Sequence, residues 1–270
     1  MSRSISLAYS PCPNDTFIFY AMTHGKIDTS PFQFDVRHCD IHTLNDLAVN
    51  QQTDMLKVSV MKYFQIQADY HLLTSGAALG MGYGPVVLTP PGASRIPPFQ
   101  KVGLPGKHTT AHLLFSLWNS QPSEIVFLPF REILTQLKTG QLDAGVVIHE
   151  SRFTYENQGI RLHVDLGAWW QEQTGMPLPL GCICLNRQRF SDAEARQLSD
   201  LVRQSIDYAR NHTDEVLHYI LEHADEKDPQ IALQHIELYV NQYTDDLGDT
   251  GLNAMSLLEK KARESGGLTS

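Results

Sequence analysis

The 270-residue sequence lacks a basic excess, a long apolar run and a secretory leader. Its 21 lysines and arginines face 30 aspartates and glutamates, for a formal net charge of −9, whereas nucleic-acid-binding proteins usually carry a basic patch. No apolar run approaches the ~20 residues that a membrane span needs. The N-terminus has no charged segment, apolar core or small-residue cleavage site. We therefore expect a cytoplasmic globular protein with neither a nucleic-acid nor a membrane partner.

Metal and nucleotide motifs are also missing. The cysteines at positions 12, 39, 182 and 184 do not have zinc-site or dithiol spacing, and no His-Glu-x-x-His pattern occurs among the twelve histidines. Glycines 80, 82 and 84 do not fit Gly-x-Gly-x-x-Gly before a helix, and residues 103–111 are not a Walker loop. The glycine-rich stretch 76–85 is instead expected to be a bend between strands. No metal site or nucleotide cofactor is expected.

Strand-like and helix-like segments alternate along most of the chain, which is the pattern of an α/β fold. Asn14 or Asp15 is expected to cap the first helix. Strands are predicted at residues 5–9, 32–39, 55–59, 72–75, 85–89, 101–104, 125–128, 144–148 and 180–185, and helices at 16–22, 43–50, 60–69, 110–118 and 133–138.

A length of 270 residues favours about two domains. The proline-rich stretch 90–98 suggests a passage between them, and the strand near residue 185 suggests a return. We therefore predict one discontinuous lobe formed by residues 1–90 and 186–270, and a second lobe formed by residues 91–185. Asp54 and Asp143 each follow a short helix and precede an apolar segment, which is consistent either with two related lobes or with chance.

The C-terminal part is predicted to be helical. Ser191 and Glu194 have the spacing of a capping box, and apolar residues follow at three- and four-residue steps. Further helices are expected from Thr213, after Asp228 and over residues 252–262. Their apolar stripes are read as core faces without a binding role.

Four segments end predicted strands, where open α/β sheets bind their ligands: residues 10–15, 57–59, 103–111 and 146–150. In the third, Thr109 and Thr110 lead into an apolar helix. Their hydroxyls and the N–H groups of a helix start suit an anion, and a carboxylate fits better than a triphosphate. The alternative is a helix cap with no ligand.

His149 ends an apolar strand, where a histidine either transfers protons or is purely structural. Lys57 either binds a substrate anion or forms an ion pair within the fold. Asp15 can be a simple cap.

Together these segments resemble the 1,4-dihydroxy-6-naphthoate synthase family of the futalosine route to menaquinone. The resemblance rests on residues 10–19, 57–59, 75–80 with 84–85, 106–111 and 148–150. It covers the chain from the first strand to about Cys184 and is looser in the helical tail. His108 departs from it, because a smaller or less basic residue is expected there.

The resemblance implies a two-lobe fold like that of type II periplasmic binding proteins, with a ligand cleft between the lobes and a helical C-terminal tail. It implies a lyase that converts cyclic dehypoxanthine futalosine to 1,4-dihydroxy-6-naphthoate and dihydroxyacetone without a cofactor. His149 matches the family's proton acceptor, and Lys57, Val58, Ser59, Thr109 and Thr110 match its substrate-binding stretches. The partner is then a small molecule that carries a carboxylate; the pattern specifies no oligomeric state.

Two other functions fit the same fold. A solute-binding receptor would need export, for which the sequence has no leader. The sister enzyme chorismate dehydratase shares the fold, but the start of the motif at residues 10–15 and His149 favour the naphthoate synthase.

Overall fold

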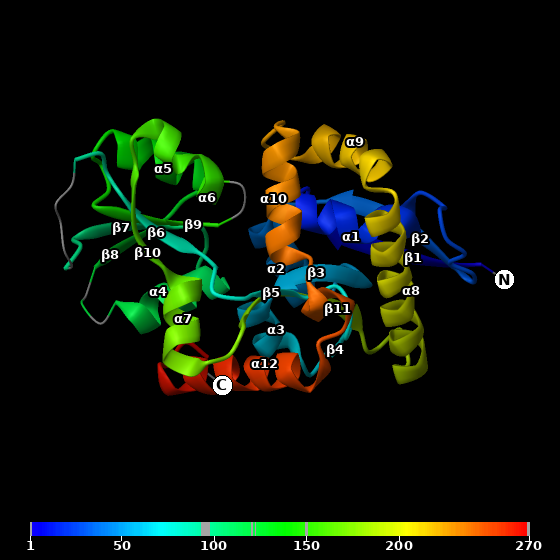
Figure 1. The fold of residues 1–270 in the computed structure, drawn as a ribbon. Helices are drawn as coiled ribbons and strands as arrows, with labels where there is room; N and C mark the ends of the chain where they lie inside the picture. The colour runs from blue at the N-terminus through cyan, green and yellow to red at the C-terminus, as the bar shows by residue number, and fades with distance from the viewer. Residues whose placement is uncertain (1, 93–97, 120, 122, 149–150, 269–270) are drawn as a thin grey trace.

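Two β-sheets, each flanked by helices, divide the chain into two lobes in the computed structural model (Figure 1). The structure describes residues 2–92, 98–119, 121, 123–148 and 151–268. The first sheet has the strand order β2-β1-β3-β11-β4, and β5 also pairs with β11. Its strands are β1 (Arg3–Tyr9), β2 (Phe32–His38), β3 (Met55–Ser59), β4 (Tyr70–Leu72), β5 (Ala78–Gly80) and β11 (Leu178–Asn186).

The second sheet has the order β10-β6-β9-β7-β8, with β7 parallel to both β8 and β9. Its strands are β6 (Val86–Thr89), β7 (Lys101–Leu104), β8 (Glu124–Phe127), β9 (Ala144–Val147) and β10 (Arg161–Asp165). Its helices are α4 (Thr110–Trp118), α5 (Phe130–Lys138), α6 (Ser151–Thr154) and α7 (Leu166–Thr174), with a 3₁₀ turn η1 (Tyr155–Gln158). The predicted two-lobe α/β architecture is confirmed.

The predicted lobe boundaries at residues 90 and 185 are wrong as sheet boundaries. Strand β6 pairs with β9 and β10 in the second sheet, so the first passage precedes Val86. Strand β11 pairs with β3, so the return precedes Leu178. The proline-rich stretch stands in the sequence between β6 and β7, two strands of the same sheet, so its prolines do not mark the passage between the sheets.

Asp54 and Asp143 occupy matching places in the two sheets. The Asp54 carboxylate accepts a hydrogen bond from Ser6 N of the neighbouring strand β1, one residue before the partner of Met55, at 3.0 Å. The Asp143 carboxylate does the same for Lys101 N, at 3.1 Å. Each aspartate immediately precedes a parallel central strand, β3 or β9, so the sequence similarity corresponds to a real structural equivalence.

The remaining helices surround the first sheet and form the C-terminal tail. The predicted capping box at Ser191 and Glu194 is confirmed, as is the Asp228 cap, which accepts from Gln230 N. These helices are α1 (Pro13–Thr23), α2 (Ile41–Val49), α3 (Val60–Ile66), α8 (Asp192–Asn211), α9 (Thr213–His223), α10 (Pro229–Tyr239), α11 (Gln242–Asp245) and α12 (Gly248–Glu264).

One hydrophobic cluster is shared by both lobes. It joins Leu56 of β3, Leu104 of β7 and Leu258 of α12, all with fully buried side chains. Figure 1 shows α12 running beneath both lobes. Burial of this shared apolar surface fixes the lobes relative to one another.

The first passage between the lobes packs directly on α7. A Cβ atom built on Gly167 would lie 2.0 Å from the carbonyl carbon of Tyr83 and 2.3 Å from Gly84 N. Because α7 leads into the second passage, this backbone contact holds the two passages together. Only glycine allows such an approach without displacing backbone.

We expect Gly167→Ala to lower the free energy of unfolding by about 1–3 kcal/mol, the usual cost of overpacking. Gly267→Ala is the matched control, since a Cβ there meets its neighbours at ordinary contact distances of 3.4 Å or more, and should change stability by less than ~0.5 kcal/mol. Urea unfolding measures both. Equal stability of the two variants would contradict the close packing of the passages.

Candidate active site

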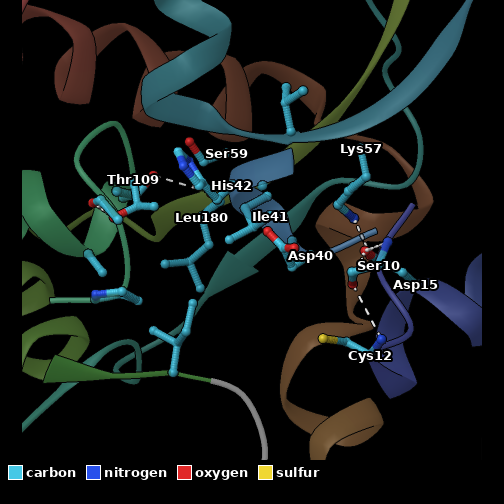
Figure 2. Close-up of a pocket in the computed structure, with 18 of the residues that line it drawn as sticks. Ser10, Cys12, Asp15, Asp40, Ile41, His42, Lys57, Ser59, Thr109 and Leu180 are labelled. Carbon is cyan, nitrogen blue, oxygen red and sulfur yellow. Dashed lines mark hydrogen bonds and ion pairs between the residues drawn. The ribbon is translucent and has the colours of Figure 1, made fainter. Parts of the chain in front are cut away.

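A cavity of about 740 Å³ lies between the two sheets and takes its lining from both lobes (Figure 2). This volume is in the range of small-molecule sites. The residues that line it include those at the ends of four strands: Ser10 after β1, Ser59 at the end of β3, Pro105 after β7 and Ile148 after β9. The cavity therefore lies at the carboxyl ends of strands, as expected for an open α/β sheet.

Polar side chains gather at two separate ends of this cavity. Figure 2 shows Ser59 and Thr109 on one side and Lys57, Ser10 and Asp15 on the other, with Leu180 and Ile41 between them. We call the first group, with Thr110 and Ala111, the threonine end. The second group, with Asn14 and His235, is called the lysine end.

At the threonine end, hydroxyl groups join the lobes. Ser59 Oγ donates to the carbonyl of His108 across the lobe boundary at 2.9 Å. Thr110 Oγ1 donates back to the carbonyl of Leu180 on β11 at 3.2 Å. Asn45 Oδ1 accepts from Ser59 N at 3.1 Å and fixes the end of β3. These contacts hold the lobes together on this side of the cavity.

Thr109 is the N-cap of α4. Its Oγ1 accepts from His112 N at 3.2 Å and donates to the carbonyl of Gly106 at 2.8 Å. Among the described residues, no acceptor faces the N–H groups of Thr110 and Ala111. Both residues line the cavity. The helix start therefore presents N–H donors, whereas the two threonine hydroxyl protons already have acceptors within the fold.

Lys107 brings a positive charge to the cavity lining at this end. Burial lowers the pKa of His108, and the neighbouring Lys62 and Lys107 lower it further. Burial also lowers the pKa of Lys62 itself. Asp46 acts on the pKa of His108 in the opposite direction. The departure at His108 thus places a titratable side chain just before the start of α4, although His108 itself does not line the cavity.

At the lysine end, Lys57 forms a buried ion pair with Asp15. Their Nζ and Oδ1 atoms are 3.0 Å apart, and both side chains are 4% exposed. Lys57 Nζ also donates to the carbonyl of Gly76 at 2.7 Å. Ser10 Oγ donates to the other carboxylate oxygen at 2.7 Å. Of the two readings of Lys57, the structure shows the ion pair within the fold.

The expected cap of the first helix is wrong. Helix α1 begins at Pro13 after Cys12, which makes no capping bond with its side chain. The Asp15 carboxylate turns back to Ser10 and Lys57 instead. A buried ammonium needs an opposite charge more than a helix start needs a cap.

Sequence reasoning missed Asn14 and His235. His235 Nε2 lies 3.0 Å from Asn14 Oδ1, and Asn14 Nδ2 donates to Asp15 Oδ1 at 2.9 Å. His235 lies on the face of α10 that also buries Ala232, Ile236 and Tyr239. A histidine within such an apolar stripe is the signal that could have found this residue, whereas the stripe alone predicts only a core face.

The predicted binding residues converge on the cavity. Lys57, Val58, Ser59, Thr109 and Thr110 all line it, although the Val58 side chain is fully buried in the core. His149, the predicted base, lies outside the described residues. Its predecessor Ile148 lines the cavity.

Two further findings on the described part of the chain concern metal-binding clusters and membrane-spanning helices. Within it, no group of three or more histidine, cysteine, aspartate or glutamate side chains is arranged to hold a metal ion. None of its helices is long and apolar enough to cross a membrane.

Comparison with solved structures identifies the fold. A protein from Archaeoglobus fulgidus superposes with a TM-score of 0.90 at 33% identity, covering 98% of both chains. A Candida albicans protein described as having the generic periplasmic binding protein fold gives a TM-score of 0.74 at 15% identity, covering 99% of this chain and 92% of its own. The predicted periplasmic-binding-protein-like fold is confirmed.

Comparison of sequences identifies the family. A family model described as menaquinone biosynthesis matches residues 5–264. A 1,4-dihydroxy-6-naphthoate synthase from Streptomyces coelicolor is 42% identical, covering 97% of this chain and 94% of the relative. One from Thermus thermophilus is 41% identical, covering 98% and 96%. With its cavity at the strand ends and this similarity along nearly its whole length, the chain belongs to the menaquinone biosynthesis family.

Proposed function

We propose that this protein is a cytoplasmic lyase that converts cyclic dehypoxanthine futalosine to 1,4-dihydroxy-6-naphthoate and dihydroxyacetone. The observation that carries the proposal is the interlobe cavity, which has N–H donors of the α4 start and the cation Lys107 at its threonine end. Two synthases of this naphthoate that are 41–42% identical support the same reaction.

The carboxylate of the substrate binds, in this proposal, at the start of α4. The N–H groups of Thr110 and Ala111 donate to it, because the Thr109 and Thr110 hydroxyl protons are directed to Gly106 and Leu180. Lys107, which lines the same end of the cavity, adds favourable charge. A carboxylate held by backbone donors needs no mobile side chain to reorganise during the reaction.

His149 is the general base of the proposed reaction. It abstracts a proton from the bound substrate, and the carbon–carbon and carbon–oxygen bonds then break to release the three-carbon fragment. The support is its position after Ile148, which lines the cavity, and its match to the proton acceptor of the family. We propose no cofactor for these steps, since proton abstraction and elimination need none.

Contact between the lobes shields this chemistry from solvent. The Ser59 and Thr110 hydroxyls bond across the cleft on one side. Arg131 Nη2 and Asp225 Oδ1 bridge it at 2.6 Å elsewhere on the rim. Each contact is weak alone, but together they favour the closed arrangement in which water is excluded.

A receptor of the same fold is the alternative from another class, supported by fold similarity at 15% identity or less. It would bind ligand without turnover. A dehydratase that acts on chorismate is the alternative enzyme.

Incubation of the purified protein with the cyclic futalosine and, separately, with chorismate distinguishes the three functions. We expect the naphthoate and dihydroxyacetone from the first substrate and no reaction with the second.

His149→Asn should lower turnover by about 10²–10⁴-fold while substrate binding persists, because the amide keeps the shape but cannot serve as base. The wild-type rate should rise with pH to a plateau as the imidazole becomes neutral. His218→Asn is the control, since His218 is exposed on α9 away from the cavity. Near-normal turnover of His149→Asn would remove this residue from the mechanism.

Thr110→Pro should weaken binding of the naphthoate product by about 10–100-fold relative to Thr110→Ala, the loss expected for one hydrogen bond to a charged group. Proline is tolerated at this first position of α4, and Thr109 before it is already extended at φ −101° and ψ 153°. The proline variant therefore removes the N–H and the alanine variant retains it. Equal affinities in calorimetry would show that the N–H is not a carboxylate donor.

Carboxylate binding should also become tighter as pH falls from about 8 to 5.5. The pKa of His108 is lowered in the free protein, and a bound anion raises it again, so binding takes up a proton in this range. His108→Gln should flatten the dependence. Calorimetry of naphthoate binding at several pH values measures this dependence. A wild-type affinity that does not change with pH would contradict the coupling between His108 and the bound carboxylate.

A further inference from the structure

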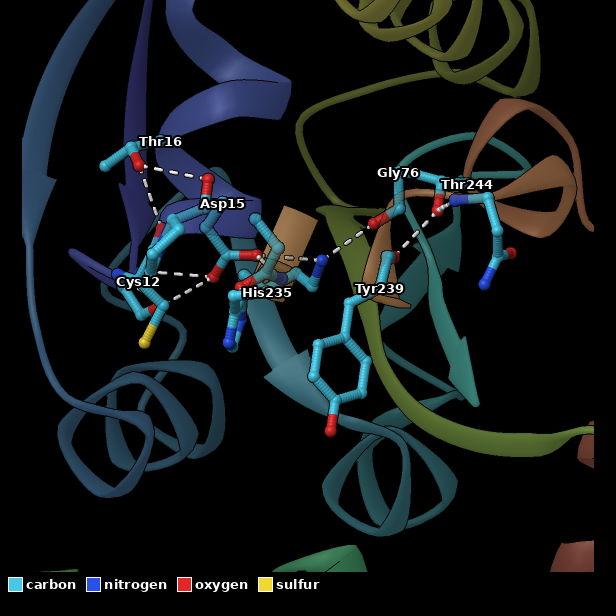
Figure 3. A network of polar contacts seen from close by, with 12 residues as sticks. Cys12, Asp15, Thr16, Gly76, His235, Tyr239 and Thr244 are labelled. Carbon is cyan, nitrogen blue, oxygen red and sulfur yellow. Dashed lines mark hydrogen bonds and ion pairs between the residues drawn. The ribbon is translucent and has the colours of Figure 1, made fainter. Parts of the chain in front are cut away.

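The lysine end of the cavity is a built polar network that the carboxylate proposal leaves unused. It runs from Lys57 through Asp15 and Asn14 to His235, and each of these residues lines the cavity. Figure 3 shows His235 beside Asp15, with contacts leading on toward Gly76. Side chains from β3, α1 and α10 meet here, so three distant parts of the sequence form it.

Hydrogen-bond chemistry fixes the orientation of each member. The ionised Asp15 accepts only, so the atom of Asn14 that faces it is the donating Nδ2. Asn14 Oδ1 therefore faces His235, and Nε2 of His235 must carry a proton to donate to it. The amide cannot flip without placing its oxygen against the carboxylate.

This orientation leaves donors for a ligand. An ammonium has three N–H bonds, and within the described residues Lys57 uses two, to Asp15 and to Gly76. Asn14 Nδ2 has two, and one is used by Asp15. Both residues are more than nine-tenths buried, at 3% and 8% exposed. Buried donors without an acceptor are costly, which indicates that oxygen atoms of a ligand complete this network.

The charge at this end favours a neutral ligand. Lys57 and Asp15 neutralise one another, as do Arg131 and Asp225, while Asp40, among the described residues that line the cavity, adds negative charge. Hydrogen bonds from Thr43 keep the pKa of Asp40 low despite its partial burial. An anion is thus favoured at the threonine end and disfavoured here, whereas hydroxyl and carbonyl oxygens suit the spare N–H groups.

We propose that Asn14 and Lys57 form a second subsite, which binds the neutral, hydroxyl-bearing end of the substrate opposite its carboxylate. Asp15 and His235 are positioning residues that hold these donors in place. The proposal rests on the proposed function, in which the released fragment carries hydroxyl and carbonyl oxygens and the retained naphthoate carries the carboxylate. The subsite would determine specificity for that fragment.

The test compares Asn14, which lines the lysine end, with Asn45, which is buried behind Ser59 at the threonine end. Asn14→Ala should weaken binding of the complete cyclic substrate about tenfold, as expected for one or two neutral hydrogen bonds, and leave naphthoate binding within about twofold. Asn45→Ala, which releases Ser59 N at the threonine end, should weaken both ligands together. Calorimetry in the His149→Asn background measures both affinities while the substrate stays intact.

Two variants of His235 test the same subsite in case Asn14→Ala does not fold. His235→Gln retains an N–H donor for Asn14 Oδ1 and should keep most of the affinity for the complete substrate, whereas His235→Leu should lose it as Asn14→Ala does. Equal loss for both ligands in Asn14→Ala, or unchanged affinity for the complete substrate, overturns the subsite. Turnover of the cyclic substrate by the wild type is measured separately. Absence of turnover would overturn the proposed function, whereas the comparison of the two binding affinities still tests the subsite.

Discussion

The buried ion pair between Lys57 and Asp15 is the contact on which the site depends. Taking two charges out of water is expensive, so the pair persists only with further hydrogen bonds, which Ser10, Asn14 and the carbonyl of Gly76 supply. These bonds tie the loop after β1 to β3. The glycine at position 181 on β11 leaves room for the lysine stem, because a Cβ there would lie 3.2 Å from Lys57 Cε.

Strand β3 gives the cavity its two unlike ends. Lys57 and Ser59 are two residues apart, so their side chains point to the same face of the sheet, while Val58 between them turns to the core. One short strand thereby positions the ion-pair network at one end of the cavity and the edge of the proposed carboxylate site at the other. Under the proposed function, a molecule that is charged at one end and hydroxylated at the other would bind in a single orientation.

The sequence was informative where local rules govern structure. The alternation of segments predicted most strands, but it missed β10 and also β5, which lies within the stretch 76–85 that was expected to be a bend. The Ser191 capping box is present, and the segments at strand ends converge on the cavity because parallel strands share an edge. The predicted lobe boundaries were wrong because proline is common in turns of every kind. Whether β6 pairs with β5 or with β9 depends on residues that are distant in the sequence. The Asp15 contact and the role of His235 could not be predicted for the same reason. Their partners lie 42 and 221 residues away in the sequence, and no local pattern encodes such a distance.

The second lobe is inserted into the first, and this order of the chain constrains biosynthesis. Strand β3 receives its neighbour β11 only when residues 178–186 have left the ribosome, after all of the second sheet. Until then β3 has an unpaired edge, which is a surface prone to wrong pairing. The second lobe, continuous from β6 to β10, completes its sheet earlier. The cavity wall around Ser59 therefore forms only after the second lobe, and stalling before residue 178 would leave that lobe attached to an aggregation-prone half-sheet.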